Sequence, residues 1–226
     1  MSAISVRRES SANGHGARSD GRLLAWTGFV GVTTLLAFGV RQGIGLPEDF
    51  RYSYWTVLVG VVSSAITLGV VVLIAGRGNL REMLALRRPR SWWRAALIGV
   101  LVVVGTGLLL VLLPFVQTSE EQGLEVDWDP DRALPFVLNA AIVVLVSPIV
   151  EELTYRGLGF TLLERFGQGW AIALTGLAFA LAHGLLLPLI SIAAFGFGLA
   201  YLRSRTRSVY PGIVIHVLVN LASSSP

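Results

Sequence analysis

Long apolar runs separated by short charged segments are the feature that most limits how this chain of 226 residues can fold. The runs carry few or no charged residues and cover residues 23–40, 54–75, 95–116, 133–150, 170–202 and 209–222. Because a helix rises about 1.5 Å per residue, each of the first four is long enough, or nearly so, to cross a hydrocarbon layer of about 30 Å. The pattern predicts an all-α fold, a polytopic bundle of transmembrane helices.

The fifth run, residues 170–202, is too long for a single crossing. Its 33 residues would form a helix of about 50 Å. Pro188 lies close to the middle of the run, and a proline interrupts a helix because it lacks a backbone N–H. We therefore expect two short spans that turn near Gly184 to Pro188, which gives the bundle about seven spans, within a range of six to eight.

The positions of the basic residues support this split and predict an orientation. All 18 basic residues are Arg, and such residues concentrate on the cytoplasmic side of a membrane protein. With a cytoplasmic N-terminus and seven spans, only Arg41, Arg51 and Arg132 fall outside. A single span over residues 170–202 would also move the three Arg of residues 203–207 outside, so the hairpin is preferred.

The composition excludes several classes of protein. Hydrophobic residues make up 54% and charged residues 14% of the chain, against about 25% charged in soluble domains, so a water-soluble globule is excluded. The absence of Cys excludes disulfides, thiolate metal sites and cysteine nucleophiles. The Arg residues are scattered through short loops, so we expect membrane lipids rather than nucleic acid as partners. The use of Arg without Lys, with abundant Ala, Val, Leu and Gly, suggests a bacterial cell membrane.

Three regions follow from these patterns. Residues 1–22 are rich in Ser, Gly and Arg without apolar periodicity, which predicts a disordered cytoplasmic tail. Residues 23–132 hold the first three spans with their loops, and we expect a structural role for them because they contain no motif. The acidic stretch 117–131 falls on the outer side. Residues 133–222 form the core that holds the candidate chemistry.

Two adjacent carboxylates, Glu151 and Glu152, directly follow the apolar run ALPFVLNAAIVVLVSPIV. Ionisable groups at membrane depth are costly and are typical of functional sites. The helical pattern continues through LTYRGLGFTLLERF, so we expect both acids inside a long helix kinked at Pro148. Glu152 and Arg156 are four residues apart and share a face, which favours an ion pair. Glu151 is rotated by about 100° and lacks that partner, so it is the carboxylate suited to act as a general base.

Two His residues also lie within apolar runs. His183 occurs in LAFALAHGL and His216 in GIVIHVLVN, and Asn220 follows His216 by four residues on the same face. Polar groups at membrane depth face the interior of a bundle rather than lipid. We therefore predict that these side chains converge with the two carboxylates on one site. Asn139 lies about three turns before Glu151, and we interpret it as a helix-packing contact.

These motifs resemble those of a known family. EELTYRG, with Glu151, Glu152 and Arg156, is similar to the EExxxR motif; FALAH, with Phe179 and His183, is similar to FxxxH; and HVLVN, with His216 and Asn220, is similar to HxxxN. All three occur, in this order and on consecutive apolar segments, in the CAAX protease and bacteriocin-processing (CPBP or Abi) intramembrane proteases, which include the type II CAAX prenyl endopeptidases. The resemblance covers about residues 133–222. Tyr155 stands where family members often have Phe.

The resemblance implies a membrane-embedded endopeptidase whose site opens towards the cytoplasm. It would hydrolyse a peptide bond near the C-terminus of a membrane-associated protein or peptide, and for a bacterial protein we expect a membrane-anchored peptide rather than a prenylated one. We hypothesise that Glu151, with His183, positions and deprotonates a water molecule. His216 and Asn220 would offer N–H donors to the oxyanion. Arg156 would orient the neighbouring carboxylate.

Three alternatives stay open at this point. Glu151, His183 and His216 would also satisfy a catalytic zinc site with three protein ligands and one open position, although metal-free chemistry is favoured and no HExxH motif is present. A non-catalytic bacteriocin-immunity or scaffold membrane protein would keep the fold but would be expected to lose a motif residue. A small transporter would show repeated halves with interrupted helices, and no such repeat is found.

Overall fold

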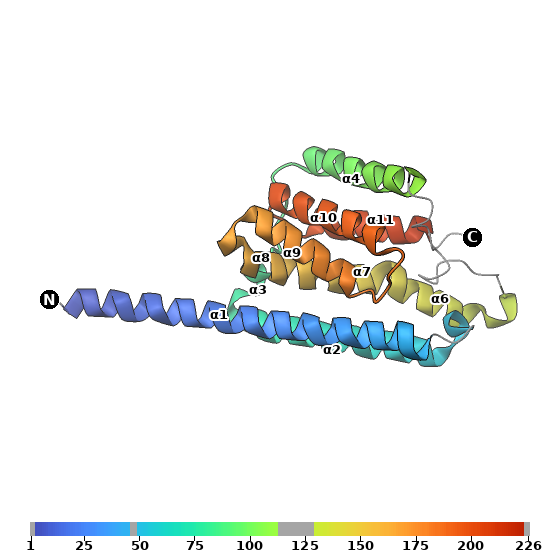
Figure 1. Ribbon diagram of the computed structural model, residues 1–226, viewed down its shortest axis with the longest axis horizontal. Coiled ribbons are helices and arrows are strands. Elements are labelled where there is room, and N and C mark those ends of the chain that lie inside the picture. The colour runs from blue at the N-terminus through green and yellow to red at the C-terminus, as the bar shows by residue number, and fades with distance from the viewer. Residues whose placement is uncertain (1–2, 46–48, 113–128, 224–226) are drawn as a thin grey trace.

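A computed structural model describes residues 3–45, 49–112 and 129–223 of the chain. Every regular element within these residues is helical, and no strand occurs among them. Figure 1 shows the helices lying alongside one another in layers, with the long first helix extending beyond the bundle. The predicted all-α helical membrane bundle is confirmed. Most of the predicted acidic stretch, residues 117–128, lies outside the described residues.

The chain order of the helices sets the frame for the site. The first half contains α1 (Ala3–Phe38) with the π-helical extension η1 (Gly39–Ile44), α2 (Tyr54–Ala75), α3 (Leu80–Met83) and α4 (Trp92–Leu112), with short 3-10 turns η2 (Phe50–Tyr52) and η3 (Arg77–Asn79). The second half contains a composite helix followed by α9 (Gln168–Leu181), α10 (Leu189–Thr206) and α11 (Tyr210–Ser223). Among the described residues, four helical segments are long and apolar enough to cross a membrane: Ser19–Ile44, Tyr54–Ala75, Trp92–Leu112 and Pro130–Phe166.

The predicted hairpin within the fifth apolar run is present. Helix α9 ends at Leu181 and α10 begins at Leu189, and α9 and α10 pack against each other. Gly184 in the turn has a φ of +66°, a conformation that glycine adopts without a steric penalty. The total number of spans and the side of the membrane that holds the N-terminus stay predictions.

One composite helix over Pro130–Phe166 carries both carboxylates, as the continuous helical pattern predicted. It consists of η5 (Pro130–Arg132), α6 (Ala133–Ala141), η6 (Ile142–Val146), α7 (Ser147–Glu152), η7 (Leu153–Gly159), α8 (Phe160–Leu163) and η8 (Glu164–Phe166). The wide π-helical turn η6 ends just before Pro148, whose ring would otherwise clash with the carbonyl four residues earlier. The second π-helical segment, η7, contains Arg156; such turns are frequent at functional sites.

Two features differ from the sequence-based expectations. Helix α1 begins at Ala3, whereas residues 1–22 were predicted to form a disordered tail. Once a span has formed, a helix extends without a new nucleation step, and the short polar segment continues it. The predicted topology placed Arg156 in a cytoplasmic segment. In the structure Arg156 is not in a loop, and its side chain is fully buried inside the bundle.

The first two spans cover one face of the composite helix, while α4 lies on the opposite side of the bundle (Figure 1). Trp26 of α1 donates from Nε1 to the carbonyl of Thr154 at 3.0 Å. Gly159 permits this approach, because a Cβ there would collide with the Trp26 ring. Asn139 donates to the carbonyls of Arg51 and Ser53 before α2, so the predicted packing contact is confirmed. These contacts bring α1 and α2 against the helix that carries the motif acids.

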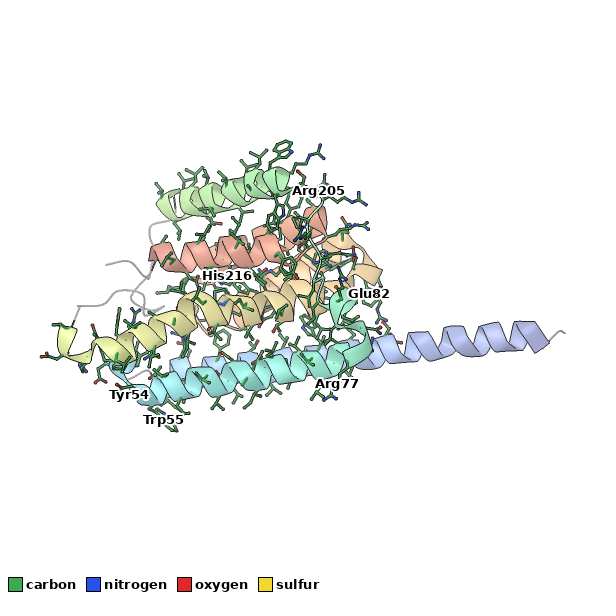
Figure 2. The ribbon with its side chains drawn as sticks, turned by 180° about the vertical axis from the view of Figure 1, so that it is seen from behind. Tyr54, Trp55, Arg77, Glu82, Arg205 and His216 are labelled. Carbon is green, nitrogen blue, oxygen red and sulfur yellow. The ribbon has the colours of Figure 1, made fainter. Side chains whose placement is uncertain are left out.

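The two ends of the bundle differ in chemistry. Figure 2 shows Arg77, Glu82 and Arg205 at one end and Tyr54 and Trp55 at the other, with His216 in the interior between them. The segments around residues 77 and 205 were both assigned to the cytoplasmic side, and they do share one end. The basic end is therefore the one that the positive-inside rule places in the cytoplasm.

Helices α9 and α10 cross where two glycines meet, and this contact generates a prediction. A Cβ at Gly196 would lie 2.8 Å from the Gly176 carbonyl oxygen and 3.0 Å from the Phe179 ring. Overpacking costs about 1–3 kcal/mol, more than the roughly 1 kcal/mol that Ala gains over Gly in a helix. Gly196→Ala is therefore expected to lower the unfolding temperature in detergent.

The matched control is Gly107→Ala in α4, where a Cβ would meet open space. This variant is expected to unfold at the wild-type temperature or slightly above it. Equal stability of the Gly196→Ala and Gly107→Ala variants would contradict the close crossing of α9 and α10.

Candidate active site

A fully buried ion pair lies at the centre of the site. Nη1 of Arg156 donates to Oε1 of Glu152 at 2.9 Å, and both side chains have 0% exposure. Nη2 of Arg156 donates to the Gly196 carbonyl of α10 at 2.9 Å, and the guanidinium carbon lies 4.2 Å from the centre of the Phe179 ring of α9. The predicted pair is present, and two further helices hold it in place through a hydrogen bond and a cation–π contact.

Helix α11 approaches this pair closely because it carries a glycine at the contact. A Cβ at Gly212 would collide with Oε2 of Glu152. This close approach brings His216, one turn further along α11, to the same carboxylate. Nδ1 of His216 lies 3.4 Å from Oε1 of Glu152.

His216 lies between the two adjacent carboxylates. Its other ring nitrogen, Nε2, lies 3.7 Å from Oε2 of Glu151, which is longer than a direct hydrogen bond. The rings of Phe179 and Phe195 meet the imidazole edge to face, with centroid distances of 5.5 Å and 5.4 Å. The imidazole is therefore confined in one orientation, with one nitrogen towards each carboxylate.

Glu151 and Glu152 occupy different environments although they are neighbours in the chain. The Glu152 side chain is fully buried and ion-paired, whereas 30% of the Glu151 side chain is exposed. Glu151 lines a cavity of about 490 Å³. Glu152 is thus a structural anion held inside the protein, and Glu151 is the carboxylate that a bound molecule can reach.

His183 lines the same cavity from the C-terminal end of α9. Its Nδ1 lies 2.8 Å from the carbonyl oxygen of Phe179, one turn earlier. Because a carbonyl oxygen only accepts hydrogen bonds, Nδ1 carries the proton and Nε2 keeps its lone pair. The FxxxH spacing therefore selects the tautomer of His183, and its Nε2 is the nitrogen able to accept a hydrogen bond.

Phe179 has a larger role than its place in a motif suggested. Its ring contacts His183 at 4.8 Å and Tyr155 at 5.6 Å between centroids, in addition to Arg156 and His216. One aromatic side chain thus separates the buried ion pair from the cavity and supports both imidazoles. The FxxxH spacing in the sequence identified Phe179 as a motif residue, but this spacing alone does not predict its contacts with the other rings.

Asn220 is separated from the cavity. Its Nδ2 donates to the carbonyl of Val143 at 2.9 Å, about two turns before the carboxylates on the composite helix. Neither Asn220 nor His216 is among the residues that line the cavity. Asn220 shares a helix face with His216, as predicted, but the structure uses its amide to join α11 to the composite helix.

The first two spans supply a wall of the cavity. The sequence motifs did not predict this contribution. Besides residues of the composite helix and α9, the lining includes polar side chains from α1, η1 and α2: Thr33, Arg41, Ser63, Ser64 and Thr67. A signal was present in the sequence, because the hydroxyl groups lie within the first two apolar runs and Arg41 directly follows the first run. The expectation of a purely structural role for these spans is therefore too narrow.

The described residues contain no group of three or more His, Cys, Asp and Glu side chains that could hold a metal ion. Glu151, His183 and His216, the set considered for zinc, do not form such a group. The arrangement that is present is a carboxylate and an imidazole nitrogen facing one cavity, backed by a second carboxylate, a second imidazole and a guanidinium. These groups can position water, move a proton and stabilise negative charge.

Comparisons with known proteins agree with this arrangement. Residues 133–222 match the family described as "Type II CAAX prenyl endopeptidase Rce1-like". A protein of Bacillus subtilis (strain 168) named "Putative membrane peptidase YdiL" is 24% identical over 207 residues, which cover 88% of this chain and 82% of that relative. No solved structure matches the chain.

The matched segment begins with α6 and ends within α11, so it contains the three motifs, the buried ion pair and both imidazoles. Its motif order is the one expected for the wider group of CAAX protease and bacteriocin-processing proteins. The match over residues 133–222 and the similarity to the Bacillus subtilis relative support the CAAX protease and bacteriocin-processing family for this part of the chain.

Proposed function

We propose that this protein is an intramembrane endopeptidase that hydrolyses a peptide bond near the C-terminus of a membrane-associated protein or peptide. The observation that carries the proposal is the separation of the two motif carboxylates. Glu152 is held inside the protein by Arg156, while Glu151 faces a cavity that His183 also lines. The match of residues 133–222 to the Rce1-like family supports a peptidase, as does the name of the Bacillus subtilis relative.

In the first step, Glu151 acts as a general base on a water molecule in the cavity. His183 accepts a hydrogen bond from this water at Nε2 and orients it. The water oxygen attacks the carbonyl carbon of the scissile peptide bond while its proton passes to Glu151. Glu151 then returns the proton to the amide nitrogen as the C–N bond breaks, which yields a carboxylic acid and an amine.

His216 and the ion pair act on the negative charge that develops on the carbonyl oxygen. Oε1 of Glu152 lies beside Nδ1 of His216, so the second ring nitrogen is directed towards Glu151. Nε2 lies 3.7 Å from Oε2 of Glu151, although His216 itself is not part of the cavity lining. The proposal therefore places the carbonyl oxygen directly beside Glu151, where a protonated Nε2 can donate a hydrogen bond to the oxyanion.

Arg156, Glu152 and Asn220 are positioning residues in this proposal. Arg156 holds Glu152, and Glu152 orients His216. Asn220 was considered as a second oxyanion donor, but its amide donates to Val143 in the structure. We assign it the task of fixing α11, and with it His216, against the composite helix.

We further propose that the site is reached from the cytoplasm of a bacterial cell. His216 is six residues from the first residue of α11, which corresponds to about 9 Å along the helix. That end of α11 follows the Arg-rich segment at residues 203–207. The positive-inside rule predicts that this segment is cytoplasmic, so the imidazole, near the middle of α11, would lie about 9 Å from the cytoplasmic end of that helix.

Replacement of Glu151 tests the base directly. Glu151→Gln keeps the size of the side chain but removes the basic oxygen, so kcat for a fluorogenic peptide is expected to fall by about 10²–10⁴-fold. Thermal stability should change little, because within the described part of the chain the ion pairs show Glu151 only beside His216, at 3.7 Å, and not with an Arg. Glu82→Gln, at an exposed glutamate of α3, is the control and should keep full activity. Undiminished turnover by the Glu151→Gln protein would remove Glu151 from the base role.

The ion pair makes a separate prediction about stability. Arg156→Gln leaves the Glu152 carboxylate buried without a cationic partner, which costs about 3–5 kcal/mol for such pairs, so the unfolding temperature should fall sharply. The double variant Glu152→Gln/Arg156→Gln removes the uncompensated charge and should recover part of that loss. Its activity should stay low because the carboxylate beside His216 is gone. A double variant as active as wild type would show that Glu152 does not position His216.

The zinc-dependent alternative is tested by removing metal. Purified protein treated with a chelator is expected to keep its peptidase activity, since base and water-orienting nitrogen are both supplied by side chains. Loss of activity with the chelator, followed by recovery on adding zinc, would instead assign Glu151, His183 and His216 to a metal site. Complete inactivity before and after both treatments, with a folded protein, would favour the non-catalytic scaffold reading.

A further inference from the structure

A cation lines the cavity that holds Glu151 and His183. Arg41 belongs to η1, at the end of the first candidate span, and its half-buried side chain is part of the cavity wall. A charged side chain in a membrane-embedded cavity is costly and typically serves a ligand or a transported group. The proposed reaction does not use Arg41, so its presence in the wall calls for another role.

Arg41 is firmly placed at the end of the cavity nearest the α9–α10 turn. Gln42, the next residue, donates from Nε2 to the carbonyl of Gly184 at 3.1 Å. Gly184 directly follows His183, and a Cβ at Gly184 would lie 2.6 Å from the backbone of Ala37. The end of the first span is thus joined to the turn after His183, and Arg41 is held beside it.

The register of α1 separates Arg41 from Glu151 along the cavity. Helix α1 runs antiparallel to the composite helix (Figure 1), and the bond from Trp26 to Thr154 sets their alignment. Glu151, three residues before Thr154, is therefore level with the part of α1 near Phe29. The backbone of Arg41 lies twelve residues further along, so about 18 Å is the upper limit for the length of cavity between the two side chains.

The wall between these two points is suited to an extended peptide. Ser63, Ser64 and Thr67 of α2 face the cavity with Thr33 of α1. The hydroxyls of Ser63 and Thr33 already donate to carbonyls of their own helices, so their oxygens are left to accept hydrogen bonds from peptide N–H groups. An extended chain covers about 3.5 Å per residue, so a limit of about 18 Å corresponds to at most about five residues.

We propose that Arg41 binds a carboxylate of the peptide substrate, and that this carboxylate is the free C-terminus about five residues or fewer from the scissile bond. A guanidinium has five N–H donors, so Arg41 can bind an anion in addition to its existing contacts. Glu151 would act at one end of the bound segment and Arg41 would hold the other. The proposal rests on the proposed peptidase function and identifies the substrate class of the same site.

Binding without turnover tests this proposal independently of catalysis. The Glu151→Gln protein, in neutral detergent, is titrated with a dansyl-labelled peptide of five aliphatic residues, either as the free acid or as the C-terminal amide. The free acid is expected to bind about tenfold more tightly than the amide, or better, because one charge-assisted hydrogen bond contributes that much affinity. Adding Arg41→Gln should abolish this preference by weakening only the free acid, while Arg41→Lys should keep part of it.

The control is Arg132→Gln, which removes a cation that does not line the cavity and forms exposed ion pairs with Asp49 and Asp129. It should keep the preference for the free acid. Equal binding of acid and amide, no binding of the acid, or equal weakening of both peptides by Arg41→Gln would overturn the proposal. A peptide amide with an acidic side chain that binds as well as the free acid would overturn the assignment to the C-terminus.

A lipid phosphate offers similar chemistry to Arg41, so two further arms separate the sources. Competition with phosphatidylglycerol, compared with phosphatidylcholine, should leave binding of the free acid unchanged. Displacement by phosphatidylglycerol alone, dependent on Arg41, would overturn the proposal in favour of a lipid headgroup. If wild-type protein cleaves no peptide although Arg41-dependent binding of the free acid is found, the proposed function fails and the carboxylate site stands.

Discussion

The buried pair of Arg156 and Glu152 is the interaction on which the rest of the site depends. A carboxylate with no exposure needs a cation and hydrogen bonds within the protein. Arg156 supplies the positive charge and one hydrogen bond, to Oε1, while also bonding to Gly196 of α10. The pair therefore ties the composite helix to α10. Glu152 in turn faces His216 of α11, so one charge interaction aligns three helices.

Glycines and one aromatic ring make this arrangement fit. Gly212 lets α11 reach Glu152, and Gly196 lets α10 approach α9. Phe179 lies against the guanidinium and both imidazoles. The glycines allow the helix backbones to approach closely, and the Phe179 ring separates the polar groups. As a result, Glu152 lies inside the protein and Glu151 lies in the cavity. This division is what gives two neighbouring acids different chemical roles.

Much of the second half of the chain could be predicted from its pattern. The unbroken helical pattern after Glu152 predicted the composite helix, Pro188 and Gly184 predicted the hairpin, and the spacing of Glu152 and Arg156 predicted the ion pair. These are local features, set by spacing within one helix or by residues that end one. The positions of α1 and α2 were not predictable in this way, because helices that are apolar on all sides carry no periodicity that identifies the neighbouring helix.

The sequence by itself determined that the chain is a helical membrane protein, which side chains are polar at membrane depth, and which family its C-terminal part resembles. The spacing also indicated that Glu151 is the carboxylate without an Arg partner. Only the tertiary structure decided that Glu151 lines a cavity, that Asn220 joins two helices, and that Arg41 shares that cavity with His183. The physical reason is that a motif specifies groups along one helix, whereas accessibility depends on which helices pack around it. In this protein that packing uses glycines, ring contacts and one buried ion pair from segments far apart in the chain.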